Sequence, residues 1–191
     1  GEPEFPTLDE FLEEELPVDG CLGFDGRVVN SELGYGPQNL LQEKNVTINC
    51  SKDLVGELWT SRPAMSCEPI WSLDVKYAGK STVEKLSDLR DAMKKNKAQI
   101  HLMTALDEIA WLFNLRGNDI VNNPVFLSYA LITQDEAYLY VQKEAIKEDT
   151  KMGKAVCAAL AEAKVQVKEY AEFLQDVAAL KNEKILLERK K

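Results

Sequence analysis

Hydrophobic and polar positions follow two different periods along the chain, and together they predict a mixture of helices and strands. Leu8, Phe11, Leu12 and Leu16 recur at helical spacing among carboxylates, which predicts a short amphipathic helix over residues 7–16. The pattern then predicts a strand, a helix that begins at its proline, and a second strand, over residues 21–29, 37–44 and 46–48. This alternation is typical of an α/β protein.

A proline-containing segment, Arg62–Pro69, separates these elements from the rest of the chain. Because each proline disfavours helix at the preceding residue, we expect an extended linker there. Ser81–Glu84 then has the sequence of a capping box. Apolar residues recur at helical spacing from Val83 to Met93, so a surface helix is expected through Lys95.

The second half of the chain continues the alternation. A buried strand over 98–104 is followed by a second capping box, Thr104–Asp107, which opens a helix that we expect Gly117 to end. Two β-rich runs separated by a short polar turn predict an antiparallel hairpin of residues 125–132 and 138–141. Helix, strand, helix and strand follow over 150–164, 165–170, 171–180 and 185–187. Since the chain stops at Lys190-Lys191, directly after a strand, we expect the natural polypeptide to continue.

Charge divides the chain at the same linker. The 191 residues hold 23 basic and 32 acidic side chains, for a net charge of −9. Residues 1–62 contain 13 of the acids and 4 of the bases, whereas residues 63–191 are formally neutral. The step predicts two pieces, 1–62 and 63–191. A nucleic-acid partner is not expected, because such proteins need a basic surface.

No targeting or membrane segment is apparent in the pattern. The longest mostly apolar stretch, Val125–Ile132, is far shorter than the roughly 20 residues that span a bilayer. The acidic start, Gly1–Glu4, lacks the basic region of a secretory signal. The four cysteines have no paired spacing, so we interpret them as free thiols and expect neither disulfides nor zinc. A cytoplasmic protein without a membrane partner is the expectation.

Two short motifs look chemical but have simpler explanations. Gly79–Thr82 imitates the end of a phosphate-binding loop, yet the first glycine of that motif is replaced by Asp74, which would repel phosphate. We interpret it as a helix N-cap beside a lysine. His101, the single histidine, lies in a predicted strand, which favours a core or sheet-face role. The alternative is a complete enzyme that uses His101 as its catalytic base.

The polar segment Leu115–Pro124 is the main candidate for a binding site. It lies between a predicted helix and a buried strand, a position where binding groups are common. A helix C-cap followed by a turn explains the same residues equally well.

The residues around this segment resemble a known family. Thr104–Asp119, with Asn123–Phe126 and Ser128–Ala130, is similar to the second N-terminal domain of the long, three-domain aminopeptidase P (Xaa-Pro aminopeptidase) family. Leu58–Pro63 and Leu73–Gly79 are similar to the entry and opening of that domain. The resemblance implies creatinase/prolidase-like α/β folds with mixed sheets flanked by helices. Residues 1–62 would be the incomplete C-terminal remainder of the first domain, and 63–191 a second domain truncated at its C-terminal end.

The resemblance also implies a parent enzyme that removes an N-terminal residue preceding proline. Its two metal ions, usually manganese, are held in a C-terminal pita-bread domain by two aspartates, one histidine and two glutamates. None of those motifs occurs in these 191 residues, so we expect no catalytic, cofactor or metal residue here and no activity from this chain alone.

The implied roles are therefore structural. They are to wall the substrate cleft, to support a homo-oligomer and to contact the catalytic domain of the same chain. The substrate would be a peptide with proline at its second position, and the substrate-facing candidates are Arg116, Asp119 and Asn123. The arginine could pair with a peptide carboxylate and the asparagine could bond to its backbone. The competing hypothesis is a free-standing α/β module for binding or assembly.

Overall fold

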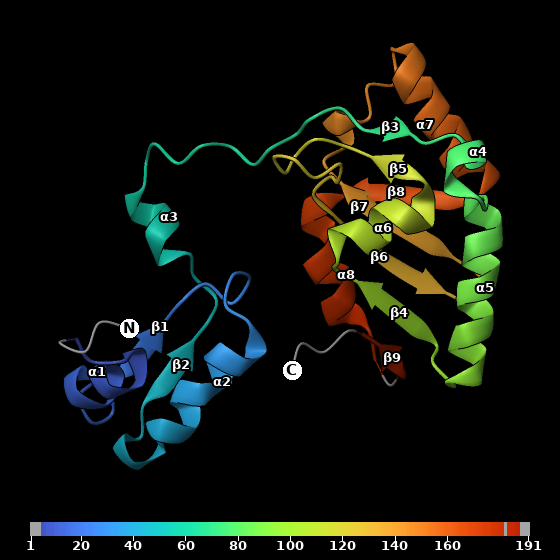
Figure 1. The fold of residues 1–191 in the computed structure, drawn as a ribbon. Helices are drawn as coiled ribbons and strands as arrows, with labels where there is room; N and C mark the ends of the chain where they lie inside the picture. The colour runs from blue at the N-terminus through green and yellow to red at the C-terminus, as the bar shows by residue number, and fades with distance from the viewer. Residues whose placement is uncertain (1–4, 182, 188–191) are drawn as a thin grey trace. The chain divides into compact units, whose positions relative to one another are not determined.

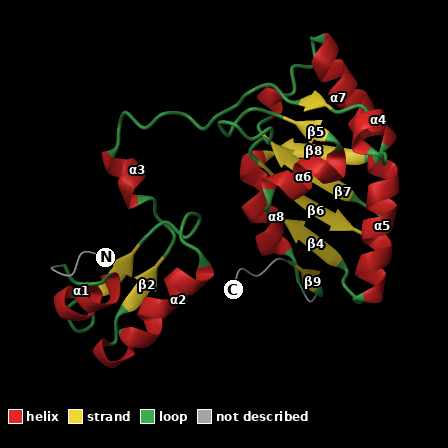
Figure 2. Ribbon diagram, viewed as in Figure 1, coloured by secondary structure: helices red, strands yellow, loops and turns green. Residues whose placement is uncertain are grey.

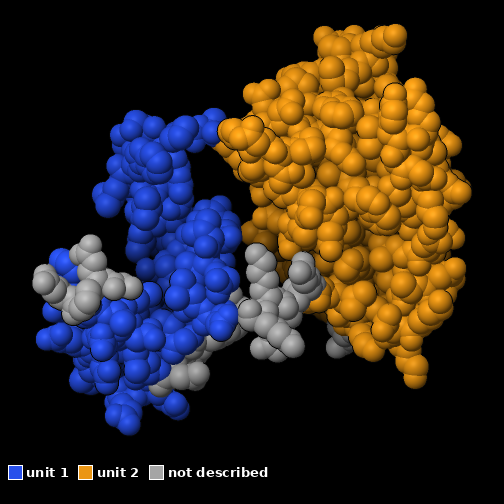
Figure 3. Space-filling model, viewed as in Figure 1, with its two compact units in different colours: residues 1–64 blue, residues 65–191 orange. Residues whose placement is uncertain are grey.

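Helices and strands alternate through the computed structural model, which describes residues 5–181 and 183–187 (Figures 1 and 2). The chain divides into two compact units, Gly1–Ala64 and Met65–Lys191, which we call the first and second unit (Figure 3). This boundary lies two residues beyond the charge step at Arg62-Pro63. Two expectations concern residues outside the described ranges: the lack of a secretory signal at Gly1–Glu4 and the continuation of the polypeptide after Lys190-Lys191.

The first unit is small and has a two-stranded sheet. Its helix α1 has the amphipathic sequence predicted for it and begins with a capping box, in which Thr7 and Glu10 satisfy each other's backbone amides. The strands pair in parallel, with Leu22 opposite Ile48. The elements are α1 (Leu8–Glu15), β1 (Cys21–Gly23), α2 (Ser31–Leu40), a 3-10 turn (Gln42–Lys44), β2 (Thr47–Asn49) and α3 (Leu54–Leu58).

Two predictions for the first unit are wrong in their limits. The strand expected over 21–29 is confined to β1, because the chain turns after Gly23 and rejoins only through an isolated bridge at Asp25. Helix α2 does not begin at Pro37; it begins at Ser31, and Pro37 lies inside it. Asn30 sets the start, since its side chain accepts from the amide of Leu33 at 2.8 Å, a stronger start signal than proline.

A mixed five-stranded sheet forms the centre of the second unit, in the order β8-β7-β6-β4-β9. The predicted hairpin is confirmed as an antiparallel pair, although its first strand begins at Ser128 and not at Val125. β8 joins β7, and β9 joins β4, in parallel. The strands are β4 (Ile100–Met103), β6 (Ser128–Thr133), β7 (Ala137–Val141), β8 (Val165–Glu169) and β9 (Ile185–Leu186).

Helices cover both faces of this sheet. Side chains of β7 alternate: Leu139 joins a core with α5, α6 and α7, whereas Tyr140 joins a smaller cluster with Phe173 of α8. The sheet is therefore buried between two helical layers. The remaining elements are β3 (Trp71–Ser72), α4 (Val75–Ala78), α5 (Thr82–Lys95), α6 (Leu106–Phe113), β5 (Leu115–Arg116), α7 (Lys151–Glu162), α8 (Phe173–Ala179) and 3-10 turns at Lys143–Ala145 and Tyr170–Glu172.

The two predicted capping boxes of the second unit have different outcomes. Ser81 and Glu84 form theirs at the start of α5, as predicted. The box at Thr104–Asp107 is wrong, because α6 starts one residue later and Ala105, without a capping side chain, occupies the N-cap. The end predicted at Gly117 is also wrong: α6 stops at Phe113, where Asn114 turns into the left-handed region at φ 52°.

No helix within residues 5–181 and 183–187 is both long enough and apolar enough to cross a membrane.

Candidate functional site

The candidate loop begins at Asn114, whose side chain joins two helices. Its Oδ1 accepts from Lys85 Nζ at 2.6 Å, and its Nδ2 donates to the carbonyl of Lys80 at 2.9 Å. The Asn114 carbonyl also accepts from the amide of Leu73 at 2.7 Å. These bonds fix the left-handed turn from which the loop leaves α6.

Lys85 supports this turn from a buried position, with only 2% of the residue exposed. Nζ donates to the Trp111 carbonyl at 2.7 Å and lies 4.3 Å from the centre of the Trp111 ring. Burial lowers the pKa of Lys85, and the nearby charge of Arg116 lowers it further. The C-terminal carbonyls of α6 attract a cation and so offset part of the free-energy cost of burying the charged amine.

Arg116, the first candidate, occupies β5, which pairs with β3. Its Nη1 donates to the carbonyls of Ala110 and Leu115, at 2.8 Å each, and the residue is half-buried. One guanidinium nitrogen thus holds the last turn of α6.

Asp119, the second candidate, uses both carboxylate oxygens inside the second unit. Oδ1 accepts from Ser66 Oγ at 2.6 Å and from the amide of Glu68 at 2.9 Å. Oδ2 accepts from the amide of Leu127 at 2.8 Å. The carboxylate therefore joins the two ends of its own loop to the segment that precedes β3.

Asn123, the third candidate, lies at the exposed tip of the loop. Its amide donates to the carbonyl of Ile120 at 3.1 Å, and the neighbouring Val121 is 86% exposed. Gly117 lies below the tip, where a Cβ would approach Phe126 Cβ to 2.7 Å, so only glycine fits without a shift. The loop thus has a tightly packed base and an open tip.

The two motifs with simpler explanations have structural partners. Glu84 accepts from the amide and hydroxyl of Ser81, and Lys80 Nζ lies 2.6 Å from Asp88 Oδ2. These contacts confirm the N-cap interpretation of Gly79–Thr82. Nδ1 of His101 lies 3.0 Å from the Leu186 carbonyl, so the ring bridges β4 and β9. This contact supports the sheet role of His101.

Lys85 and Asn114 were not singled out by the sequence interpretation. A signal for Lys85 was present: it occupies the inner stripe of α5, four residues before the half-buried Leu89 and next to the buried Leu86. A lysine on an apolar stripe indicates a buried amine that has found an acceptor. For Asn114 the signal was weaker, since asparagine tolerates the left-handed conformation but glycine is the commoner helix end.

Comparison with known proteins identifies the class to which this fold belongs. A family model described as Creatinase/Prolidase N-terminal domain matches residues 61–191. The chain therefore belongs to this family, which confirms the resemblance and the fold expected from it. Residues 61–191 contain the mixed sheet described above and the candidate loop.

Individual relatives define the family branch more closely. The chain is 44% identical to a "Probable Xaa-Pro aminopeptidase P" of Neurospora crassa, over 95% of this chain and 26% of the relative. It is 38% identical to the Sordaria macrospora protein of the same name, over 95% of this chain and 29% of that protein. It is 32% identical to "Aminopeptidase P1" of Arabidopsis thaliana, over 96% of this chain and 28% of that protein.

A solved structure agrees with these relatives. The crystal structure of X-prolyl aminopeptidase from Caenorhabditis elegans, described as a cytosolic enzyme with a di-nuclear active site, matches with a TM-score of 0.78 at 28% identity. The match covers 93% of this chain and 28% of the other. This chain thus spans less than a third of the aminopeptidases to which it is similar.

The residues that the structure describes offer no counterpart of the di-nuclear centre of that enzyme. Among residues 5–181 and 183–187, no group of three or more His, Cys, Asp or Glu side chains is placed to hold a metal ion. The residues described here therefore do not fit such a centre, and no catalytic step is assigned to them.

Proposed function

We propose that this chain is the non-catalytic N-terminal part of a metal-dependent Xaa-Pro aminopeptidase, which hydrolyses the bond between an N-terminal residue and a penultimate proline. One observation carries the proposal: similarity to aminopeptidases P extends over 95% of this chain, while the chain accounts for only 26 to 29% of their length. The two divalent metal ions, which we propose to be manganese, belong to a catalytic domain outside these 191 residues.

The first test uses the chain as it stands. With Mn²⁺ and a Xaa-Pro peptide, the 191-residue chain is expected to show no hydrolysis above a buffer control. Measurable turnover that disappears with a chelator would overturn the assignment. It would favour the alternative hypothesis of a complete enzyme that uses His101.

Within the parent enzyme, we assign the loop of Arg116, Asp119 and Asn123 to one wall of the substrate cleft. The open tip and the guanidinium of Arg116 support this role. Nη1 makes both bonds described for Arg116, so the rest of its guanidinium can pair with a peptide carboxylate. Asp119, by contrast, has its oxygens committed to internal donors and positions the loop.

The second test replaces Arg116 by alanine in the full-length enzyme. Loss of a charge-assisted hydrogen bond costs about 1.5 to 3 kcal/mol, so kcat/KM for Xaa-Pro peptides should fall by roughly 10- to 100-fold. Arg90→Ala is the matched control, because Arg90 is also half-buried and donates to one carbonyl, that of Thr133 at 3.0 Å. The assignment fails if kcat/KM is unchanged for both short and long peptides, or if both variants lose it equally.

Homo-oligomerisation and a cytosolic location complete the proposal. A cytosolic location is supported by the description of the Caenorhabditis elegans enzyme. Exposed apolar side chains of the first unit, such as Val28 and Leu58, supply surface for a contact between copies. Light scattering should then give a mass above that of one chain for the full-length enzyme. A monomeric mass at micromolar concentration would overturn the proposed role in homo-oligomerisation.

A further inference from the structure

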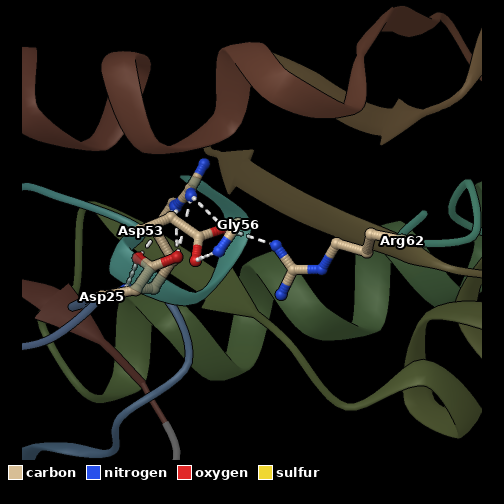
Figure 4. A network of polar contacts seen from close by, with 5 residues as sticks. Asp25, Asp53, Gly56 and Arg62 are labelled. Atoms are coloured by element: carbon tan, nitrogen blue, oxygen red, sulfur yellow. Dashed lines mark hydrogen bonds and ion pairs between the residues drawn. The ribbon is translucent and has the colours of Figure 1, made fainter. Parts of the chain in front are cut away.

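A charged network in the first unit holds the residue at which the linker begins (Figure 4). Oδ1 of Asp53 accepts from the amide of Gly56 at 2.7 Å, and Oδ2 pairs with Nη1 of Arg62. The hydrogen bond from the Gly56 N–H and the pairing with Arg62 keep the pKa of Asp53 below its usual range. The Arg62 guanidinium also lies over the Trp59 ring, 5.7 Å from its centre. Arg62 is thus held against α3.

A second set of bonds, inside the second unit, holds the residue at which the linker ends. Ser66 donates its hydroxyl to Asp119 at 2.6 Å, and its carbonyl accepts from the side-chain amide of Gln142. The Glu68 amide donates to the same oxygen of Asp119 at 2.9 Å. Beyond them, Ile70 is buried, and its amide donates to the carbonyl of Ala145 at 3.0 Å. Asp119 and Gln142 thus hold this end of the linker together, and Asp119 accepts two of the three bonds.

Only three residues, Pro63, Ala64 and Met65, lie between Arg62 and Ser66, and all three are exposed. Proline fixes its own φ and restricts Arg62 before it. A flexible connection of four residue steps has a root-mean-square length of about 11 Å. Without the two carboxylates, the nearest positions held by other contacts are Trp59, whose amide donates to Val55 of α3, and Cys67, which packs against the core of the second unit. They are eight steps apart, for which the same relation gives about 16 Å.

We propose that the hydrogen bonds and ion pair of Asp53 and Asp119 fix the two ends of the linker, so that the flexible connection between the units is a hinge of three residues. Asp119 also accepts from Leu127 at the far end of the candidate loop, so it joins the hinge to that loop. The proposal is independent of the aminopeptidase assignment, because it concerns contacts within this chain alone.

Distances between two spin labels test the hinge directly in the 191-residue chain. One label is placed on the exposed Cys21 and the other on Met152→Cys, with Cys50→Ser, Cys67→Ala and Cys157→Ala. Asp53→Ala and Asp119→Ala should each widen the distance distribution, and the double variant should widen it about 1.4-fold. Asp149→Ala, which removes the same charge from an exposed site, should leave it unchanged. An unchanged width in the double variant, or equal widening by Asp149→Ala, would overturn the proposal.

A milder pair of variants guards against misfolding. Asp119→Asn keeps the size of the side chain, and Ser66→Ala removes a single bond. Amide exchange at Glu68 should accelerate in Asp119→Asn, together with a wider label distribution, while Ser66→Ala gives a smaller effect of the same kind. Faster exchange at Glu68 with the label distribution unchanged would show a purely local bond and would refute the hinge.

Discussion

The two units reach a folded state by different means. Of the described aliphatic and aromatic side chains in the first unit, Leu12 and Leu41 are buried, while Phe5, Val28 and Leu58 are largely exposed. The second unit buries a continuous core that extends along both faces of its sheet. The first unit instead has helix caps, an exposed ion-pair network and two parallel strands, an arrangement that is usually covered on both faces.

The difference has an energetic meaning. A fully buried Leu or Phe side chain contributes about 1.5 to 3 kcal/mol, whereas an exposed ion pair contributes about 0 to 1 kcal/mol. The second unit therefore has many strong contributions that act together. The first has a few weak ones that depend on solution conditions, and it should be the first to open.

The largest expected effect comes from removing a core phenylalanine of the second unit. Phe113→Ala opens a cavity at a residue with 0% exposure and should cost about 3 to 5 kcal/mol of unfolding free energy. Phe11→Ala, at a residue that is 50% exposed in the first unit, should change stability by less than about 1 kcal/mol. Denaturant unfolding of both variants measures the contrast. Equal losses would mean that the first unit has a core comparable to that of the second.

A glycine in each unit sharpens the same comparison. Gly117→Ala places a Cβ 2.7 Å from Phe126 and should destabilise the second unit by about 1 to 3 kcal/mol. Gly34→Ala lies within α2, where the nearest atom is 3.6 Å away, and should stabilise the first unit by about 0.5 to 1 kcal/mol. Thermal unfolding, with amide exchange to separate the units, reports both signs. A stabilising Gly117→Ala would show that the loop base yields to the added methyl.

The smallest effect is the response of the first unit to acid. A bidentate contact with Arg27 lowers the pKa of Asp25 to about 2. A lowered carboxyl pKa stabilises the fold above the unfolded value, near 3.9, and this contribution is lost as the pH falls from about 4 to 2. Amide exchange at Arg27, whose N–H donates to Asp25, should accelerate in that window. Asp25→Asn should abolish the acid-dependent step while leaving the second unit unchanged; a step that persists would require another carboxylate.

Sequence patterns predicted the elements whose signals are local. The capping box at Ser81 and Glu84 and the hairpin around Thr133 depend on residues a few positions apart, and both were found. The end of α6 was missed because Asn114 is held by Lys85 and Lys80, 29 and 34 residues earlier. Distant partners of this kind leave no periodic signal in the chain.

The candidate loop shows the same limit at the level of single side chains. Its position after α6 and before the buried strand β6 could be predicted from the sequence. The short strand β5, which takes up Leu115 and Arg116 of the expected loop, could not, because its partner β3 lies more than 40 residues earlier. The hydrogen-bond partners of the Asp119 side chain could not be predicted, because Ser66 and Glu68 lie 53 and 51 residues away. Whether Arg116 and Asn123 contact a substrate remains a prediction for the full-length enzyme.

The parallel pairing of β9 with β4 has a consequence for synthesis on the ribosome. His101 and Leu186, which meet in this pair, are 85 residues apart, so one edge of β4 stays open while that length of chain is made. At 5 to 20 residues per second, the wait is roughly 4 to 17 seconds. An open strand edge can pair with a neighbouring nascent chain. Slow translation of these residues should therefore favour aggregation of this protein over native docking of β9.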